Sequence, residues 1–214
     1  MDRLSADATA SASVNAESQP APATSRRRLI GAAGLAGLAS AATALTSSTV
    51  SAAPEDQPNI PTEADTALLA QAMQLELAAR DLYRRRLADD VGAGDISEVV
   101  SVMAENHEAY AQAIAGATGL SANTRNEAVY DSFVEAFEGG RTQFATAARD
   151  LEEAAVATHT ALLSEFQSAD AVNLTASILV VEARHATVLA DLLGVELSDR
   201  LANAGAPLQL GGAA

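Results

Sequence analysis

Residues 177–194 read "SILVVEARHATVLADLLG", and this stretch decides the fold. Glu182 and His185 stand three positions apart within an otherwise apolar pattern of helical period. At about 100° per residue both side chains share a helix face with Ile178 and Leu189, so they point towards a protein interior. Ionisable side chains are costly to bury unless they are paired, hydrogen-bonded or bound to metal. The stretch therefore predicts a buried helix that carries either a metal site or an internal ion pair.

The composition favours a compact all-α protein with an acidic surface. Hydrophobic residues make up 49% of the chain but aromatic residues only 3%, so small aliphatic side chains must fill the core. Strand-rich folds rely more on aromatic and β-branched residues. The formal net charge is −15 and lysine is absent, which argues against nucleic acid or an anionic membrane as a partner. The absence of cysteine excludes disulfides, thiolate metal sites and a thiol nucleophile.

Four long segments show a helical repeat, and none shows the alternation of a strand. They cover about 63–87, 96–117, 141–167 and 169–193, and a shorter helix is predicted over about 124–137. Thr62 and Asp95 are plausible N-caps of the first two helices, and Gly194 ends the last one. Short connections between the last two helices imply antiparallel neighbours. An up-down four-helix bundle with a short extra helix between the second and third long helices is the architecture we expect.

Projection of the helices places all three histidines of the chain, together with three glutamates, on inner faces. The inward ionisable residues are Glu76 on the first helix, His107 on the second, Glu152 and His159 on the third, and Glu182 with His185 on the fourth. Tyr83 and Tyr110 share these inner faces. Glu105 and Glu108 fall outside the apolar face of the second helix and are expected to be solvated. The sequence thus concentrates its carboxylates and imidazoles in one bundle core.

Carboxylate oxygens and imidazole nitrogens are suitable ligands for iron, manganese or zinc. In di-iron carboxylate bundles two helices give one glutamate each, and two give a Glu-x-x-His pair. Three helices fit this arrangement, through Glu76, Glu152 and the pair Glu182 and His185. The second helix does not, because His107 and Tyr110 stand where a glutamate and a histidine are expected. A site with one metal ion, or a degenerate site, therefore stays open beside a two-metal site.

Each inward residue also has a simpler interpretation when it is taken alone. Glu76 could pair with Arg80 at i+4, and Glu152 could form a solvated pair with Glu153. A buried His–Glu hydrogen bond would explain Glu182 and His185 without a metal. Tyr83 and Tyr110 could be core tyrosines whose hydroxyls are hydrogen-bonded. His159 could be a core histidine that donates to a carboxylate. Only the combination on three helices favours a metal site.

The N-terminal region has the composition of an export signal. Residues 1–24 are predicted to be disordered, and "SRRRLIGAAGLAGLASAATALTSSTVSAAPE" follows, with Arg26, Arg27 and Arg28 before an uncharged run over 29–50. Paired arginines before a mildly apolar run indicate the twin-arginine translocase as the export route, with cleavage after Ala52. The alternative is an uncleaved membrane anchor formed by residues 29–50. The expected organisation is a leader over 1–52, a linker over 53–61, the bundle over 62–194 and a flexible tail over 195–214.

The stretches "LELAARDLY", "LEEAAVATH" and "SILVVEARHATVLADLLG" resemble the matching helices of bacterial exported ferritin-like domain proteins, a group that is similar to plant desiccation-related proteins. The resemblance covers about 62–194 and implies a ferritin-like four-helix bundle. It further implies that Glu76, Glu152, Glu182 and His185 occupy positions that the family uses for two metal ions. His107 could still bind metal, whereas Tyr110 would be an unusual ligand.

Two functions follow as hypotheses. The first is an exported metal-binding protein that oxidises Fe(II) with oxygen or peroxide, or protects against redox damage, with Tyr83 in electron transfer or in hydrogen bonding to a ligand. Iron, as one or two ions, is the expected cofactor, with manganese or zinc as alternatives. The second is a non-catalytic bundle at the cell surface with a degenerate metal site. A homodimer is left open as the assembly, and cage-forming iron storage is a weaker alternative.

Overall fold

The computed structural model describes residues 58–88 and 96–211, and these residues contain helices but no strand. The helices are α2 (Glu63–Ala88), α3 (Ser97–Thr118), α4 (Glu127–Phe137), α5 (Arg141–Leu163), α6 (Ala169–Leu192) and α7 (Leu197–Arg200). The predicted all-α class is confirmed, and α4 is the short extra helix between the second and third long ones. α5 ends four residues before the predicted end, because Ser164 and Glu165 close tighter i−3 hydrogen bonds to the carbonyls of Ala161 and Leu162.

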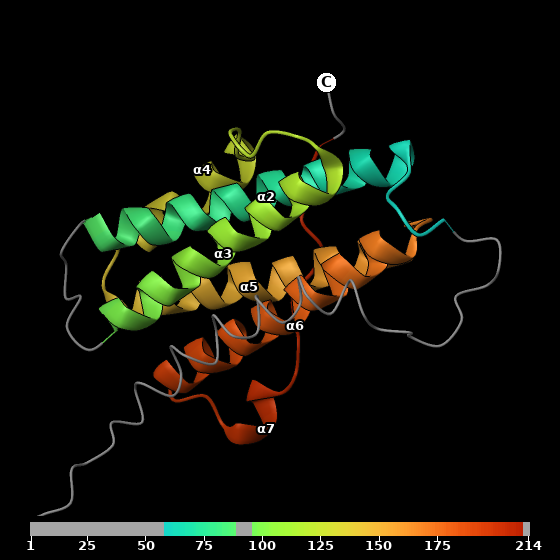
Figure 1. Ribbon diagram of the computed structural model, residues 1–214. Helices are drawn as coiled ribbons and strands as arrows, with labels where there is room; N and C mark the ends of the chain where they lie inside the picture. The colour runs from blue at the N-terminus through green and yellow to red at the C-terminus, as the bar shows by residue number, and fades with distance from the viewer. Residues whose placement is uncertain (1–57, 89–95, 212–214) are drawn as a thin grey trace, which may run out of the picture.

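The four long helices form two layers, α2 with α3 and α5 with α6 (Figure 1). Neighbouring helices are antiparallel, as expected. The connectivity is not a simple up-down one, because α3 and α5 run in the same direction and the chain returns along the bundle between them (Figure 1). α4 lies on this return path and packs against α2 and α5. This crossover needs its own apolar contacts, and Val129 and Phe137 of α4 supply them as buried residues.

The start of α2 is fixed by a reciprocal pair of hydrogen bonds. The backbone N–H of Asp65 donates to Thr62 Oγ1 at 3.1 Å, and the Thr62 N–H donates to Asp65 Oδ2 at 2.9 Å. This arrangement satisfies two of the free donors of a helix N-terminus, as the expected capping role of Thr62 requires. The other oxygen of Asp65 accepts from the Gln167 N–H at 2.7 Å and ties the turn before α6 to α2. The second expected cap, Asp95, lies outside the described residues.

The apolar core is divided into two clusters along the bundle. One contains Leu82, Val100, Phe144 and Leu189, and the other contains Leu69, Ile114, Phe166 and Ile178. On α6 the residues Ile178 and Leu189 belong to different clusters, and Glu182 and His185 lie between them in sequence. Alanines such as Ala79 and Ala148, 1% and 0% exposed, allow the helices to approach closely. The ionisable side chains therefore occupy the middle of the bundle.

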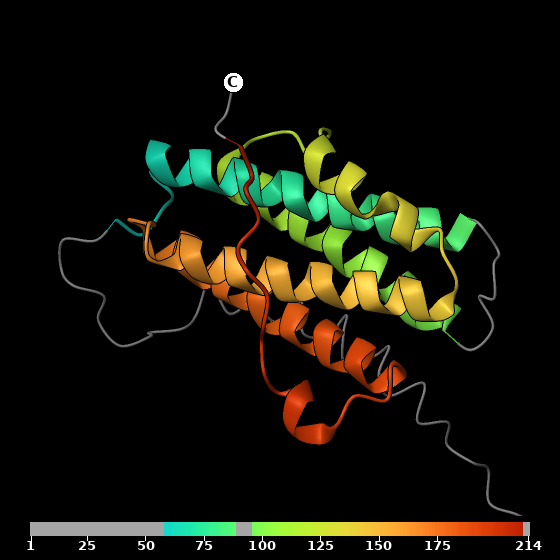
Figure 2. The ribbon, with the colours of Figure 1, turned by 180° about the vertical axis from the view of Figure 1, so that it is seen from behind.

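Residues 195–211, which the sequence predicts to be a tail, lie against the bundle in part. After α7 the chain runs across α5 and α2 (Figure 2). The Leu208 N–H donates to Thr158 Oγ1 at 2.8 Å, and the Leu210 carbonyl accepts from Asn126 Nδ2 at 3.0 Å. Leu208 and Leu210 also pack against the apolar cluster that contains Leu82. Apolar side chains at alternate positions of "PLQL" explain this docking, which the helical repeat could not reveal.

Several predictions fall on residues that the structure does not describe. These are the leader over 1–52 with Arg26, Arg27, Arg28 and Ala52, the anchor alternative over 29–50 and most of the linker over 53–61. Residues 212–214 of the predicted tail are also outside. Within 58–88 and 96–211, no helix has the length and apolar character needed to span a membrane.

Gly205→Ala is expected to destabilise the protein. A Cβ at this position would lie 2.3 Å from the carbonyl oxygen of Glu153, so the docked segment must move away from α5. Overpacking of this kind costs about 1–3 kcal/mol of the free energy of unfolding, measurable by urea denaturation. Gly116→Ala on α3 is the matched control, because a Cβ at this position would meet nothing within 4 Å. That change should stabilise the helix by up to about 1 kcal/mol. Equal effects of the two variants would contradict a tightly docked segment.

Candidate metal centre

Six ionisable side chains meet in the middle of the bundle, and we call them the core cluster. They are Glu76 on α2, His107 on α3, Glu152 and His159 on α5, and Glu182 and His185 on α6. The exposed fraction is 0% for each of the four residues Glu76, Glu152, His159 and Glu182, 1% for His107 and 6% for His185. All six residues that the helical projection turned inward are therefore brought together.

His107 lies at the centre of the core cluster, between two carboxylates. Its Nδ1 is 2.7 Å from Glu76 Oε2, and its Nε2 is 3.2 Å from Glu152 Oε1. The two edges of one imidazole ring therefore face carboxylates from α2 and α5. A histidine at this position links the two layers of the bundle.

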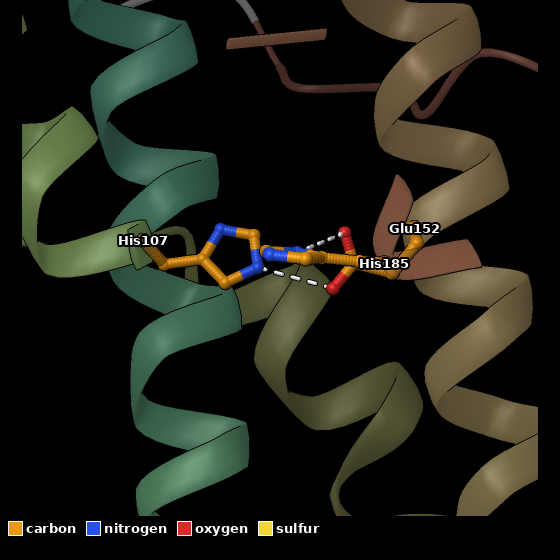
Figure 3. Close-up of side chains that lie close together, drawn as sticks. All are labelled: His107, Glu152 and His185. Atoms are coloured by element: carbon orange, nitrogen blue, oxygen red, sulfur yellow. Dashed lines mark hydrogen bonds and ion pairs between the residues drawn. The ribbon is translucent and has the colours of Figure 1, made fainter. Parts of the chain in front are cut away.

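His185 approaches Glu152 from the neighbouring helix α6. Its Nδ1 is 3.3 Å from Glu152 Oε2, so the two oxygens of Glu152 face two imidazoles, Oε1 that of His107 and Oε2 that of His185 (Figure 3). The Nε2 of His185 lies 3.0 Å from Asn106 Nδ2. An amide nitrogen only donates, so Nε2 accepts this bond and Nδ1 carries the proton that faces Glu152. Asn106 was missed from the sequence, although its position directly before His107 at the edge of the inner face was a usable signal.

His159 connects the remaining two carboxylates. Its Nδ1 is 2.8 Å from Glu182 Oε2, and its Nε2 is 3.4 Å from Glu76 Oε1. Carboxylates and imidazoles thus alternate through the whole core cluster, in the order His185, Glu152, His107, Glu76, His159 and Glu182. The interpretation of His159 as a histidine that donates to a carboxylate agrees with its contact to Glu182.

The two tyrosines differ in how their hydroxyls are satisfied. The Tyr83 hydroxyl donates to Glu152 Oε1 at 2.5 Å, and its ring stacks on His107 with centroids 5.6 Å apart. The Tyr110 ring meets the His107 ring edge-on at 6.1 Å, but its hydroxyl is buried without a hydrogen-bond partner among the described residues. The expectation of a hydrogen-bonded hydroxyl is therefore confirmed for Tyr83, whereas the described residues offer the Tyr110 hydroxyl no partner.

The simpler interpretations of two glutamates are wrong. Arg80 does not pair with Glu76, because its guanidinium reaches Asp81 and Glu108 at 2.8 Å each. Glu152 is not part of a solvated pair with Glu153, because both are buried and Glu153 pairs with Arg149 at 2.7 Å. Both arginines lie on outer parts of their helices, so the carboxylates of the core cluster depend on imidazoles.

The charges of the core cluster are mutually dependent. Burial disfavours a charged His107, but the carboxylates of Glu152 and Glu76 raise its pKa well above 6.5. Burial would likewise raise the pKa of Glu152, yet the imidazoles of His185 and His107 hold that pKa well below its usual value. In the metal-free protein His107 is therefore a cation between two carboxylates.

Glu182 and His159, at one end of the core cluster, bind protons more tightly than isolated side chains would. Burial raises the pKa of Glu182 to about 7, because the charge of His159 offsets only part of that effect. Burial lowers the pKa of His159, but Glu182 and Glu76 outweigh it and raise the value to about 8. Any cation that enters here competes with protons.

Two overlapping groups of the core cluster have ligand atoms close enough to hold a metal ion. One is Glu76, His107 and Glu182, which we call the Glu76 set, and the other is His107, Glu152 and His185, the His185 set. Ligand atoms within each set lie within 4.8 Å of one another. Glu76 Oε1 and Glu182 Oε1 are buried without a hydrogen-bond partner among the described residues, and Glu76 Oε1 has only the longer ion-pair contact of 3.4 Å to His159 Nε2. Buried acceptors without a donor are unfavourable, and a cation would satisfy them, so the residues fit a divalent transition metal.

The fold and the core cluster together define a class: an all-helical bundle with buried glutamates and histidines that are compatible with a metal site. The model of the ferritin-like domain family matches residues 64–195, which is more than half of the chain. The protein belongs to the ferritin-like domain family. No curated protein and no solved structure matches the chain.

The metal-free protein should lose stability as the pH rises from about 5 to about 9. The folded-state pKa values of Glu182 and His159, about 7 and about 8, exceed the ordinary values of 4.5 and 6.5. The folded state therefore holds more protons than the unfolded state in this range, and its free energy of unfolding falls as those protons leave. Urea denaturation in the presence of a chelator measures the effect.

Glu182→Gln should flatten this pH dependence, because the variant lacks the carboxyl group that titrates. Glu105→Gln is the matched control, since Glu105 is exposed on α3 and its change should leave the slope as it is. A stability that rises from pH 5 to 9 with chelator present would contradict the charge assignment.

Proposed function

We propose that this protein is an exported ferritin-like protein that binds a transition metal ion in the bundle core and acts in iron oxidation or redox protection. Iron is the expected ion, with manganese or zinc as alternatives, because all three accept carboxylate and imidazole ligands. The observation that carries the proposal is the pair of buried oxygens, Glu76 Oε1 and Glu182 Oε1, that lack a hydrogen-bond partner among the described residues. Bound iron would supply one-electron exchange with oxygen or peroxide.

The chain's own residues divide into those that would hold the ion and those that orient them. Glu76, Glu152, Glu182, His107 and His185 make up the two sets with ligand spacing. The Tyr83 hydroxyl, which donates to Glu152 Oε1, fixes the orientation of that carboxylate. Burial of the whole core cluster excludes bulk water, so charge changes at the ion would be felt strongly by these residues.

A second candidate function is a non-catalytic bundle at the cell surface with a degenerate metal site. One observation favours it: each of the three imidazoles already has a carboxylate within 3.3 Å. Such a network can fix the register of helices without any ion. Metal content separates the two functions, because the network alone predicts none.

Protein purified from its own host should carry close to one or two equivalents of iron, manganese or zinc, measured by elemental analysis. Glu182→Gln should lower this content to background, because it removes a buried anionic ligand while keeping the shape of the side chain. Glu105→Gln should retain the metal of the unmodified protein. Less than about a tenth of an equivalent in the unmodified protein, after anaerobic reconstitution as well, would leave only the non-catalytic bundle.

The export part of the proposal has its own test. The secreted protein should begin at Ala53 by mass spectrometry if cleavage follows Ala52. Replacing Arg26, Arg27 and Arg28 by lysine keeps the positive charge but removes the paired arginines, so the precursor should stay inside the cell. Uncleaved protein in the membrane fraction would favour the anchor alternative over 29–50.

A further inference from the structure

The two sets with ligand spacing share one residue, and this limits how many ions the core can hold. His107 belongs to both the Glu76 set and the His185 set. Its Nδ1 faces Glu76 and its Nε2 faces Glu152, so opposite edges of the ring serve the two sets. A neutral imidazole has one nitrogen with a free lone pair, while the other carries a proton. His107 can therefore be a ligand in only one set at a time.

The set that does not receive the lone pair of His107 is left with two protein ligands. In a di-iron bundle a glutamate on this helix avoids that limit, because its two oxygens can reach two ions. His107 stands at that position, and Tyr110 stands where the accompanying histidine would be. The residues of this chain thus fit one ion and do not fit two.

Unsatisfied atoms favour the Glu76 set as the place of that ion. Glu76 Oε1, Glu182 Oε1 and the Tyr110 hydroxyl are buried without hydrogen-bond partners among residues 58–88 and 96–211. Both oxygens of Glu152 already accept, Oε1 from Tyr83 and Oε2 from His185. An ion in the Glu76 set would replace the hydrogen bond between His107 Nδ1 and Glu76 Oε2 but would satisfy the free Glu182 Oε1, whereas one in the His185 set would have to displace a donor from Glu152, both of whose oxygens already accept.

Charge and proton positions lead to the same set. A divalent ion bound by the carboxylates of Glu76 and Glu182 gives a site with a net charge of zero. An ion in the His185 set, where Glu152 is the only carboxylate, would leave a net positive charge in an apolar core. His185 points its protonated Nδ1 at Glu152 and its accepting Nε2 at Asn106, so its lone pair is already engaged. The His107 Nε2–H donates to Glu152 Oε1 when Nδ1 is the ligand atom, which is the usual orientation of a metal-bound histidine.

We propose that the protein binds a single divalent metal ion through Glu76, His107 and Glu182, and that Glu152 orients His107 instead of binding a second ion. This inference rests on the proposed metal-binding function and specifies its stoichiometry and ligands. His159 completes the arrangement, because its Nδ1 lies 2.8 Å from Glu182 Oε2 and donates to that ligand. Tyr83 holds Glu152 in turn.

The stoichiometry is tested by anaerobic titration of the chelator-treated full chain with Mn(II), followed by equilibrium dialysis and electron paramagnetic resonance. We expect one Mn(II) per chain and the spectrum of an isolated ion. Two Mn(II) per chain with a spin-coupled spectrum would overturn the inference and leave the proposed metal-binding function standing. No bound Mn(II), Co(II) or Fe(II) in the unmodified protein would overturn both.

The ligands are tested by the Mn(II) affinity of variants whose fold is checked by circular dichroism. Glu76→Gln and Glu182→Gln should weaken binding more than the roughly 10–100-fold that loss of an outer hydrogen-bond partner costs, and Glu152→Gln should fall within that range. His185→Gln should weaken Mn(II) binding less than Glu76→Gln and Glu182→Gln do, because His185 contacts Glu152 and not the ion. Loss of binding in His185→Gln with retention in Glu182→Gln would place the ion in the His185 set and overturn the assignment. If the glutamate variants do not fold, the stoichiometry of the unmodified protein still decides between one ion and two.

Discussion

The structure depends on one constraint: the three carboxylates of the core cluster are buried in an apolar bundle, and they need positive charge beside them. An isolated ionised carboxylate is very costly to bury, and each buried carboxylate here instead contacts an imidazole. Three histidines match three glutamates, and they are all the histidines that the chain contains. The alternation makes every charge depend on its neighbours. The same property explains why protons and a metal ion are alternative occupants of one region.

This constraint shapes the packing around it. Helices that carry the core cluster must meet closely enough for side chains of adjacent layers to touch, and buried alanines on α2 and α5 provide the room. The apolar core is consequently split into two clusters, one at each side of the ionisable residues. The aromatic residues are concentrated at one of these sides, where Tyr83, Phe137 and Phe144 pack edge to face. The polar centre is thus enclosed by two apolar regions.

Helical periodicity was enough to predict the helices and the inward position of all six members of the core cluster. It could not predict their pairing, because the face of a helix fixes the direction of a side chain and not its partner. Arg80 and Glu76 illustrate this: their spacing allows a pair, yet Arg80 is drawn to Asp81 and Glu108. The contact of Asn106 with His185 and the docking of residues 195–211 join segments distant in the chain, which local patterns do not encode.

The docked C-terminal segment has a consequence for the order of folding. Asn126 caps α4 through Val129, yet its side-chain amide also donates to the Leu210 carbonyl, 84 residues along the chain. The hairpins α2–α3 and α5–α6 need only short-range closure, whereas this bond requires the whole bundle to be assembled first. The crossover helix should therefore be secured last. Amide protons of α4 would then exchange with solvent by partial openings that leave the core cluster intact.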